Sequence, residues 1–309
     1  MPFRDMRDYL AALEQQNLLR RVSREVNHNW EVACLAKWMY QALPIDRRFG
    51  LYFQNVKGTT IPVVTGALGA CPASVAVALQ CEVGEINRTV VGAVRNPIKP
   101  RIVDRGVCQD IVLAGDTATL DTLPIVTWTP GKDKAPYLTT IVVTRDHDTG
   151  IPNMGVYRTM VLDNRAVVVN LSPNRQGTRN VQTWIEKGKK APIAWVIATE
   201  PVVHLATVAN LPYGRDEIEL AGGLKGEPID LVRCRSIDLA VPANAEIIVE
   251  AEIAPDEKHD EGPFGEFAGY MGQVEKRPIA RVTAITHRRD PIFYGYTSQM
   301  PPSESTTIQ

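Results

Sequence analysis

The sequence predicts an α+β protein in which a small α/β part precedes a larger part built mostly of strands. Three observations support this fold class. Helix-like and strand-like patterns alternate at short intervals over residues 5–79. Strand-like runs dominate from Ile111 onward, which favours a sandwich or a barrel. A basic connector that contains prolines, residues 95–110, separates the two parts.

The first part is expected to hold three helices, a strand and a hairpin. Asp5 is a suitable N-cap for the first helix, Pro44 ends the second, and Pro72 lies close to the favoured first-turn position of the third. In chain order we expect a helix at 5–19, a strand at 19–26, a helix at 30–43, a hairpin at 51–65 and a helix at 72–79. Together they predict an N-terminal α/β domain over residues 1–105.

The second part is expected to form a β domain over residues 106–297. Helices are predicted only at 179–190 and 216–224. Gly, Pro or Asp-Asn clusters bound many of the strand-like runs, which lie at 138–144, 155–169, 193–199, 229–234, 246–253, 278–286 and 292–296. Residues 298–309 contain prolines and are interpreted as a linker that leaves this domain.

Composition excludes several function classes. The 309 residues carry a net charge of -1, which gives no electrostatic reason to expect a nucleic-acid partner. No apolar run approaches the roughly 18 residues of a membrane-spanning helix. The five cysteines are scattered without a Cys-x-x-Cys pair, as in proteins with reduced thiols. A cytoplasmic location is therefore expected.

Two carboxylates flank a tight turn in Glu261-Gly-Pro-Phe-Gly-Glu266. Proline fixes one backbone angle and the two glycines permit unusual ones, so the turn holds both acids at a defined separation. Paired carboxylates in unequal environments provide one ionised group and one proton donor near neutral pH. The apolar residues around them, Phe264, Phe267, Tyr270 and Met271, suggest that Glu266 is partly buried.

A second motif, Asn153-Met-Gly-Val-Tyr-Arg158, follows a strand-like run and a turn. An arginine among apolar residues is costly unless a carboxylate accompanies it. Glu261 and Glu266 are the obvious partners for Arg158. A purely structural salt bridge is the alternative interpretation of such a pair.

Both motifs together resemble the UbiD family of reversible decarboxylases. The resemblance covers nearly the whole chain, because Phe53-Gln-Asn-Val-Lys-Gly58, Val241 to Glu250 and Pro301-Pro-Ser-Glu304 follow in the family order. It implies that the β domain is a flavin-reductase-like split β-barrel. The C-terminal α/β domain of the family is expected to be absent, which makes the chain a fragment or a separate subunit. A full-length member is expected to be a homo-oligomer.

The resemblance implies the non-oxidative, reversible decarboxylation of an aromatic or α,β-unsaturated carboxylic acid through a covalent adduct with prenylated FMN, which a flavin prenyltransferase supplies. The catalytic residues carried over are Arg158, Glu261 and Glu266. Arg158 would contact the substrate carboxylate and Glu261, and Glu266 would deliver a proton to the carbon that lost CO2. An apolar pocket and a cofactor that takes up electrons suit this chemistry.

The resemblance also implies a divalent cation, Mn2+ or Mg2+, with a K+ ion nearby. Asn153, Asn174 and Glu217 correspond to its ligands, and oxygen ligands of this kind suit a hard cation. Asn174 stands where the family usually has a histidine, which leaves the metal's identity open. The residues expected to bind the cofactor are Asn153, Met154, Gly155, Val156, Tyr157, Arg158, Asn174, Arg175 and Glu217.

Other enzyme classes lack support in the sequence. Gly66-Ala-Leu-Gly69 and Gly222-Gly223 do not have the spacing of a dinucleotide fingerprint, and no serine lies in a Gly-x-Ser-x-Gly elbow. A second hypothesis is a flavin-binding subunit of a multi-component carboxylase that is inactive on its own.

Overall fold

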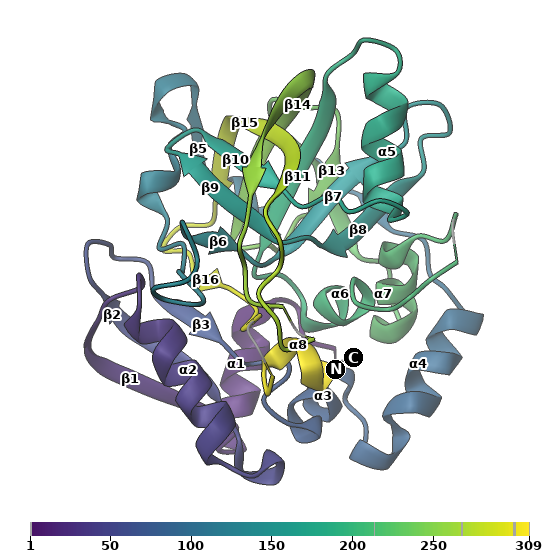
Figure 1. The fold of residues 1–309 in the computed structure, drawn as a ribbon. Helices are drawn as coiled ribbons and strands as arrows, with labels where there is room; N and C mark the ends of the chain where they lie inside the picture. Colours follow the sequence, from purple (N-terminus) through teal and green to yellow (C-terminus); the bar gives the residue numbers. More distant parts are fainter. Residues whose placement is uncertain (1, 213, 267, 299–300, 309) are drawn as a thin grey trace.

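Figure 1 shows a computed structural model of the chain, which describes residues 2–212, 214–266, 268–298 and 301–308. Its strands form a four-stranded, a nine-stranded and a three-stranded sheet. The helices are α1 (Met6–Gln15), α2 (Glu31–Ala42), α3 (Pro72–Leu79), α4 (Ile86–Arg95), α5 (Gln176–Ile185), α6 (Pro201–Ala206), α7 (Glu217–Lys225) and α8 (Glu304–Ile308). In the part of the chain described, no helix is long and apolar enough to cross a bilayer.

The four-stranded sheet has the order β1-β2-β3-β16 and uses both ends of the chain. Its strands are β1 (Leu19–Val26), β2 (Gly50–Val56), β3 (Val63–Thr65) and β16 (Phe293–Tyr294). The predicted hairpin is confirmed, because β2 and β3 pair antiparallel, and the helix expected at 72–79 has those bounds. The helix expected at 5–19 ends earlier, at Gln15, since Asn17 adopts a left-handed conformation.

The nine-stranded sheet forms the core of the second part. Along it the order is β6-β9-β10-β15-β14-β11-β7-β8, and β5 pairs with β15. These strands are β5 (Ile111–Ala114), β6 (Tyr137–Leu138), β7 (Ile141–Arg145), β8 (Pro152–Val156), β9 (Thr159–Asp163), β10 (Ala166–Val169), β11 (Ala191–Ile197), β14 (Ile247–Glu261) and β15 (Glu275–His287). A small sheet of β4 (Arg101–Ile102), β12 (Asp230–Arg233) and β13 (Ala240–Pro242) lies beside it.

Two short links force this sheet to curl. Only Tyr157 and Arg158 join β8, at one edge, to β9, which lies next to the opposite edge. Two residues span at most about 11 Å between the flanking Cα atoms. Likewise, only Thr139 and Thr140 join β6, at the second edge, to β7. The opposite edges therefore meet, and the sheet is a curled half-barrel.

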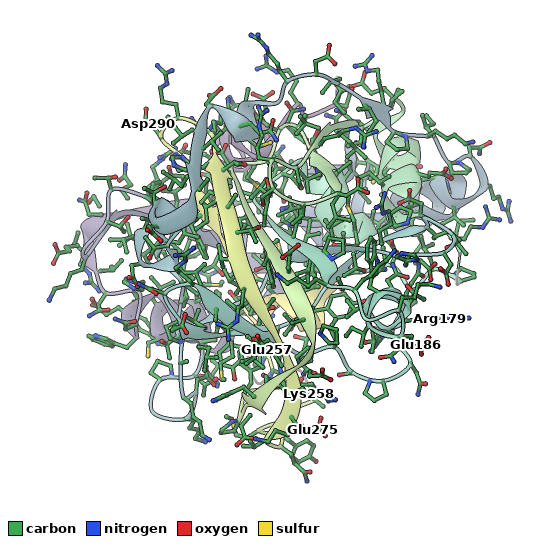
Figure 2. All side chains as sticks on the ribbon, turned by 90° about the horizontal axis from the view of Figure 1, so that it is seen from above. Arg179, Glu186, Glu257, Lys258, Glu275 and Asp290 are labelled. Atoms are coloured by element: carbon green, nitrogen blue, oxygen red, sulfur yellow. The ribbon has the colours of Figure 1, made fainter. Side chains whose placement is uncertain are left out.

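Several sequence boundaries shift in the structure. The strand-like run expected at 155–169 is broken, because β8 ends at Val156 and a turn at Asn164-Arg165 separates β9 from β10. The helix expected at 179–190 is α5, which begins at Gln176 and ends at Ile185. In Figure 2, Arg179 and Glu186 lie at the periphery of the molecule, consistent with their exposure to solvent. Three of the helices, α4, α6 and α8, were not predicted.

Glu304 fixes the last described residues to the first part of the chain. Its carboxylate is completely buried and accepts hydrogen bonds from the backbone N–H groups of Gly66, Leu68, Gly69 and Thr297. The Tyr294 hydroxyl donates to the same group at 2.6 Å. Five donors compensate the desolvation of one carboxylate, and they hold α8 against the β3–α3 turn.

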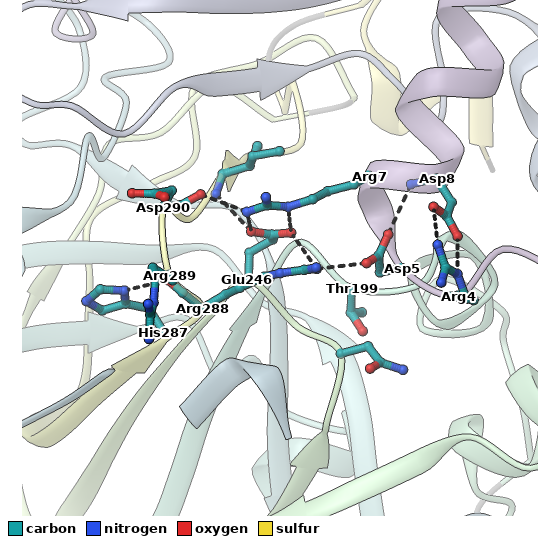
Figure 3. A network of polar contacts seen from close by, with 12 residues as sticks. Arg4, Asp5, Arg7, Asp8, Thr199, Glu246, His287, Arg288, Arg289 and Asp290 are labelled. Carbon is teal, nitrogen blue, oxygen red and sulfur yellow. Dashed lines mark hydrogen bonds and ion pairs between the residues drawn. The ribbon is translucent and has the colours of Figure 1, made fainter. Parts of the chain in front are cut away.

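A second buried acid connects α1 to the large sheet (Figure 3). Glu246 accepts two hydrogen bonds from the Arg7 guanidinium, both at 2.7 Å, and one from the backbone N–H of Ile292 at 3.1 Å. Arg288 lies 3.4 Å from Glu246 and 2.7 Å from Asp5, the N-cap of α1. The network therefore joins the start of the chain to the segments before β14 and after β15.

We expect Glu246→Gln to destabilise the fold by about 3 kcal/mol, because it leaves the Arg7 guanidinium without its buried counter-charge. Urea unfolding measures the change. Asp8→Asn breaks an ion pair with Arg4, whose side chain is 84% exposed, and should cost less than about 1 kcal/mol. Equal losses in the two variants would contradict a structural role for this network.

Candidate active site

One guanidinium contacts two carboxylates where the edges of the curled sheet meet. Arg158 donates to Glu261 through Nε at 3.0 Å and through a terminal nitrogen at 2.7 Å, and its other terminal nitrogen contacts Glu266. Arg158 comes from the link between β8 and β9, whereas Glu261 ends β14 and Glu266 follows it. The expected meeting of these three side chains is present in the structure.

The turn after β14 positions both acids. Gly262 has a φ of +97°, a conformation that favours glycine. The backbone closes on itself, since Gly272 N–H donates to Phe264 O at 2.7 Å and Glu266 N–H donates to Tyr270 O at 2.8 Å. A Cβ on Gly272 would lie 2.9 Å from Arg158, so this glycine leaves room for the guanidinium.

The two acids differ in their surroundings. The Glu261 side chain is completely buried, whereas 34% of the Glu266 side chain is exposed. Phe264 is buried, and the centre of its ring lies 5.3 Å from the Arg158 guanidinium carbon, which adds a cation–π contact. Tyr270 does not shield the acids, because it is 75% exposed, and Phe267 lies outside the described residues. Partial burial of Glu266 is confirmed, but Glu261 is the deeper acid.

Asn153, at the start of the motif that ends with Arg158, forms a second polar contact with Glu217. Asn153 lies on β8, and its side-chain N–H donates to Glu217 at 3.2 Å, while the Met154 N–H donates to the same carboxylate at 2.9 Å. Tyr157 donates its hydroxyl hydrogen to Asn153 Oδ1 at 3.0 Å and accepts from the Gly177 N–H at 3.1 Å. Glu217 begins α7, where the helix dipole favours negative charge.

The Asn153–Glu217 pair has the chemistry expected of two ligands for a hard cation. Burial raises the pKa of Glu217 to about 7, and no lysine or arginine among the described residues forms an ion pair with it. A divalent cation beside Glu217 would supply the missing positive charge. The described residues contain no cluster of three or more His, Cys, Asp or Glu that would hold a metal without Asn153.

The remaining predicted cofactor residues occupy two places. Met154, Gly155 and Val156 complete β8 in line with Asn153. Asn174 and Arg175 lie on the exposed approach to α5, whose Gly177 N–H donates to the Tyr157 hydroxyl, and Asn174 adopts a left-handed conformation. Arg175 is the N-cap of α5 without a side-chain capping bond. An uncapped helix start beside an arginine suits a phosphate.

Sequence reasoning missed two residues that the fold brings to the arginine. Tyr137, at the start of β6, packs its ring on Phe264 with centroids 4.4 Å apart. Gly272 lies against the guanidinium, as described above. Neither belongs to a motif, and the only signal for Tyr137 was an aromatic residue before a strand-like run. His204 is a completely buried core histidine, and burial lowers its pKa to about 3.

Comparison with protein families finds two matches. The 3-octaprenyl-4-hydroxybenzoate carboxy-lyase Rift-related domain (UbiD) matches residues 101–301. The N-terminal domain of the same carboxy-lyase (UbiD_N) matches residues 10–94. Among curated proteins, the chain is 29% identical over 329 residues to the uncharacterized protein sll0936 of Synechocystis sp.. This match includes 99% of the chain but only 65% of the relative's length.

Comparison with solved structures also finds similar chains. The chain is similar to an evolved dimeric form of the UbiD-class enzyme HmfF from Pelotomaculum thermopropionicum in complex with prFMN, with a TM-score of 0.89 and 35% identity over 98% of this chain and 68% of that one. It is also similar to the vanillic acid decarboxylase of Sedimentibacter hydroxybenzoicus in closed form, with a TM-score of 0.93 and 27% identity over 100% and 67%.

We expect Arg158 and Glu261 to be strongly coupled, because removal of Arg158 leaves the completely buried Glu261 carboxylate without its positive partner. In a double-mutant cycle of Arg158→Met and Glu261→Gln, urea unfolding should give a coupling energy of about 2 kcal/mol. The same cycle on the exposed Lys190–Glu252 pair should give less than about 1 kcal/mol. Similar coupling in both pairs would show that the buried contact is not structural.

The pKa of Glu217 predicts a pH-dependent stability. Since it rises from 4.5 to about 7 in the folded state, the folded protein binds more protons than the unfolded chain in this window. The free energy of unfolding should therefore fall as the pH rises from 4.5 to 7. Above that window, added Mn2+ or Mg2+ should raise the melting temperature.

Glu217→Gln should remove both the pH dependence that this group contributes and the response to the cation. Thermal melts of wild type and variant, with and without metal at each pH, measure this. A variant that responds to Mn2+ as the wild type does would remove Glu217 from the cation site.

Proposed function

The chain belongs to the UbiD family of carboxy-lyases, and from that premise we propose that it catalyses the reversible, non-oxidative decarboxylation of an aromatic or α,β-unsaturated carboxylic acid. The single observation that carries this proposal is the contact of Arg158 with both Glu261 and Glu266. A salt bridge that only stabilised the fold would need one carboxylate. The second acid is partly exposed, which leaves it accessible to a substrate.

Each side chain has a role that its surroundings support. Arg158 binds and orients the substrate carboxylate, since a guanidinium matches that group with two hydrogen bonds. Glu261 is buried and holds the guanidinium in place. Glu266 carries the proton that replaces CO2 on carbon, which requires a protonated carboxyl near neutral pH. Phe264 and the apolar surroundings exclude water from the departing carboxylate.

The cofactor of this proposal is prenylated FMN, the group that gives UbiD-class enzymes their electron sink through a covalent bond to the substrate. Residues Asn153 to Arg158 would line it. A divalent cation on Asn153, Glu217 and Asn174, with a K+ ion nearby, would neutralise its phosphate, and Arg175 would add a further positive charge. The buried carboxylate of Glu217 and the uncapped start of α5 support this placement.

We also propose the finer architecture and partners implied by the family. The curled sheet is interpreted as a flavin-reductase-like split β-barrel over residues 106–297, with an N-terminal domain at 1–105 and a linker at 298–309. A cytoplasmic location, a flavin prenyltransferase as cofactor supplier and a homo-oligomeric full-length protein complete the proposal. The relative bound to prFMN and its dimeric form support the cofactor and the oligomer by analogy.

A second candidate function is a flavin-binding subunit or fragment that is inactive on its own. The chain spans 65% of the length of the curated relative. Flavin absorbance without turnover in this chain, and turnover once the family's C-terminal domain is supplied, would favour this candidate.

We expect Glu266→Gln to reduce decarboxylation, and deuterium exchange from D2O into the product acid, by at least about a hundredfold, because glutamine has no proton to give. The protein should be co-expressed with a flavin prenyltransferase and assayed against a panel of aromatic and α,β-unsaturated acids. The flavin absorbance of the variant should match that of the wild type.

Glu252→Gln is the matched control, since Glu252 pairs with Lys190 on the surface, and its activity should be unchanged. Full activity in Glu266→Gln would refute the assignment of Glu266 as the acid. Absence of exchange in the wild type with every acid, despite bound flavin, would refute the enzymatic function of this chain.

A further inference from the structure

Helix α2 has an apolar inner face and an aromatic outer face. The inner face packs into the core that residues of β2 also line, through Val32, Ala33, Ala36, Met39 and Tyr40. Figure 1 shows α2 at the outside of the molecule, so its other face points to solvent. Two tryptophans lie there, Trp30 and Trp38, whose exposed fractions are 51% and 69%. Tryptophan is highly buried in most proteins, so this face indicates a surface that binds a partner.

The exposed side chains follow one line along the helix. Trp30 is the N-cap of α2, and Cys34 and Trp38 follow at intervals of four residues. Residues four apart lie above one another on a helix, so the exposed Cys34 lies between the two tryptophans. We call Trp30, Cys34 and Trp38 the outer stripe of α2. None of its side chains is charged, so a partner can cover the stripe without burying an ion.

The outer stripe is symmetric about Cys34. A two-fold axis beside this residue places two copies of α2 antiparallel, with each Cys34 opposite the other. Trp30 of one copy then lies at the level of Trp38 of the second copy, at both ends of the pair. Two-fold interfaces are the commonest in homo-oligomers, and in them one surface patch binds its own copy. The stripe therefore suits a second copy of this chain.

The charges of α2 follow the same symmetry. The helix contains only two charged residues, Glu31 and Lys37, which lie three positions before and after Cys34. The two-fold axis brings Glu31 of each copy to the level of Lys37 of the other. Glu31 binds Arg24 at 2.9 Å, whereas Lys37 has no ion-pair partner within the described chain. A second copy supplies opposite charges at matching levels, which favours it over a protein of another sequence.

We propose that the outer stripe of α2 is a homodimer interface, in which two α2 helices pack antiparallel around Cys34. This inference names a surface for the homo-oligomer of the proposed function and does not depend on the decarboxylation. The tryptophans are its anchors, since this residue type dominates the binding energy of many interfaces. One pair of 12-residue helices is smaller than the roughly 1,600 Å2 of a standard interface, so we expect a dissociation constant in the micromolar range.

Sedimentation equilibrium of the cofactor-free, 309-residue chain tests the interface. The wild type should change from monomer to dimer as its concentration rises. Trp38→Glu should weaken the dimer at least about a hundredfold, because it removes an anchor and places a carboxylate among apolar groups. At concentrations where both proteins are monomeric, their melting temperatures should agree, since Trp38 is mostly exposed.

Val91→Glu is the matched control. Val91 lies on α4 and is 49% exposed, so its replacement should leave the dimer unchanged. A wild type that stays monomeric at every concentration would overturn the proposal. A dimer on which Trp38→Glu and Val91→Glu have the same effect would also overturn it, although the chain would still be a homo-oligomer through another face.

Lys37→Glu tests the antiparallel arrangement. In the proposed pair it brings two acids to the same level at both ends, so the dimer should weaken about tenfold. In a parallel pair, Lys37 would meet its own copy, and the change would exchange one repulsion for another. A dimer as tight as that of the wild type would therefore refute the antiparallel pair.

Chemical cross-linking tests the place of the two-fold axis. In a chain with Cys81→Ser and Cys234→Ser, the two other remaining cysteines are buried and Cys34 is the accessible thiol. A short bismaleimide should join two Cys34 thiols into a covalent dimer, and Trp38→Glu should prevent this. Failure to cross-link a chain that sediments as a dimer would refute the interface. All of these measurements use cofactor-free protein, so they decide the interface whether or not the chain turns over a substrate.

Discussion

The site depends on the shortness of two links between opposite edges of one sheet. A longer connection between β8 and β9 would let the sheet stay open, and Arg158 would then lie on a surface loop far from Glu261. With only Tyr157 and Arg158 available, the edges have to approach each other, and the guanidinium is drawn into the seam. The link between β6 and β7 repeats the constraint and brings Tyr137 to the same seam. The curl of the sheet therefore also brings the side chains of the site together.

Burial sets the chemistry of that seam. A guanidinium enclosed with one buried acid would be an inert structural pair, whose desolvation largely offsets its attraction. The second, partly exposed acid gives the cluster a group that solvent or a substrate can reach. A similar principle applies to Asn153 and Glu217, where a buried carboxylate that forms no ion pair within the described part of the chain provides a place for a cation.

Much of this arrangement could be predicted from the sequence, and the failures have physical causes. Periodicity located the N-terminal hairpin and α3, and the cost of an unpaired buried arginine predicted that Arg158 meets Glu261 and Glu266. Periodicity did not reveal the break at Tyr157 and Arg158, because both residues suit a strand. It could not identify Tyr137 or the deep burial of Glu261, since both depend on packing between segments far apart in the sequence.

The position of β16 bears on how the polypeptide folds during its synthesis. The N-terminal sheet accepts β16 beside β3, and the loop before α3 needs the Glu304 carboxylate for three of its N–H groups. Neither β16 nor Glu304 is available to the N-terminal sheet until the ribosome has translated the residues in between. The N-terminal sheet therefore cannot form all of its native contacts until these last residues are synthesised. Contacts of such long sequence separation slow folding.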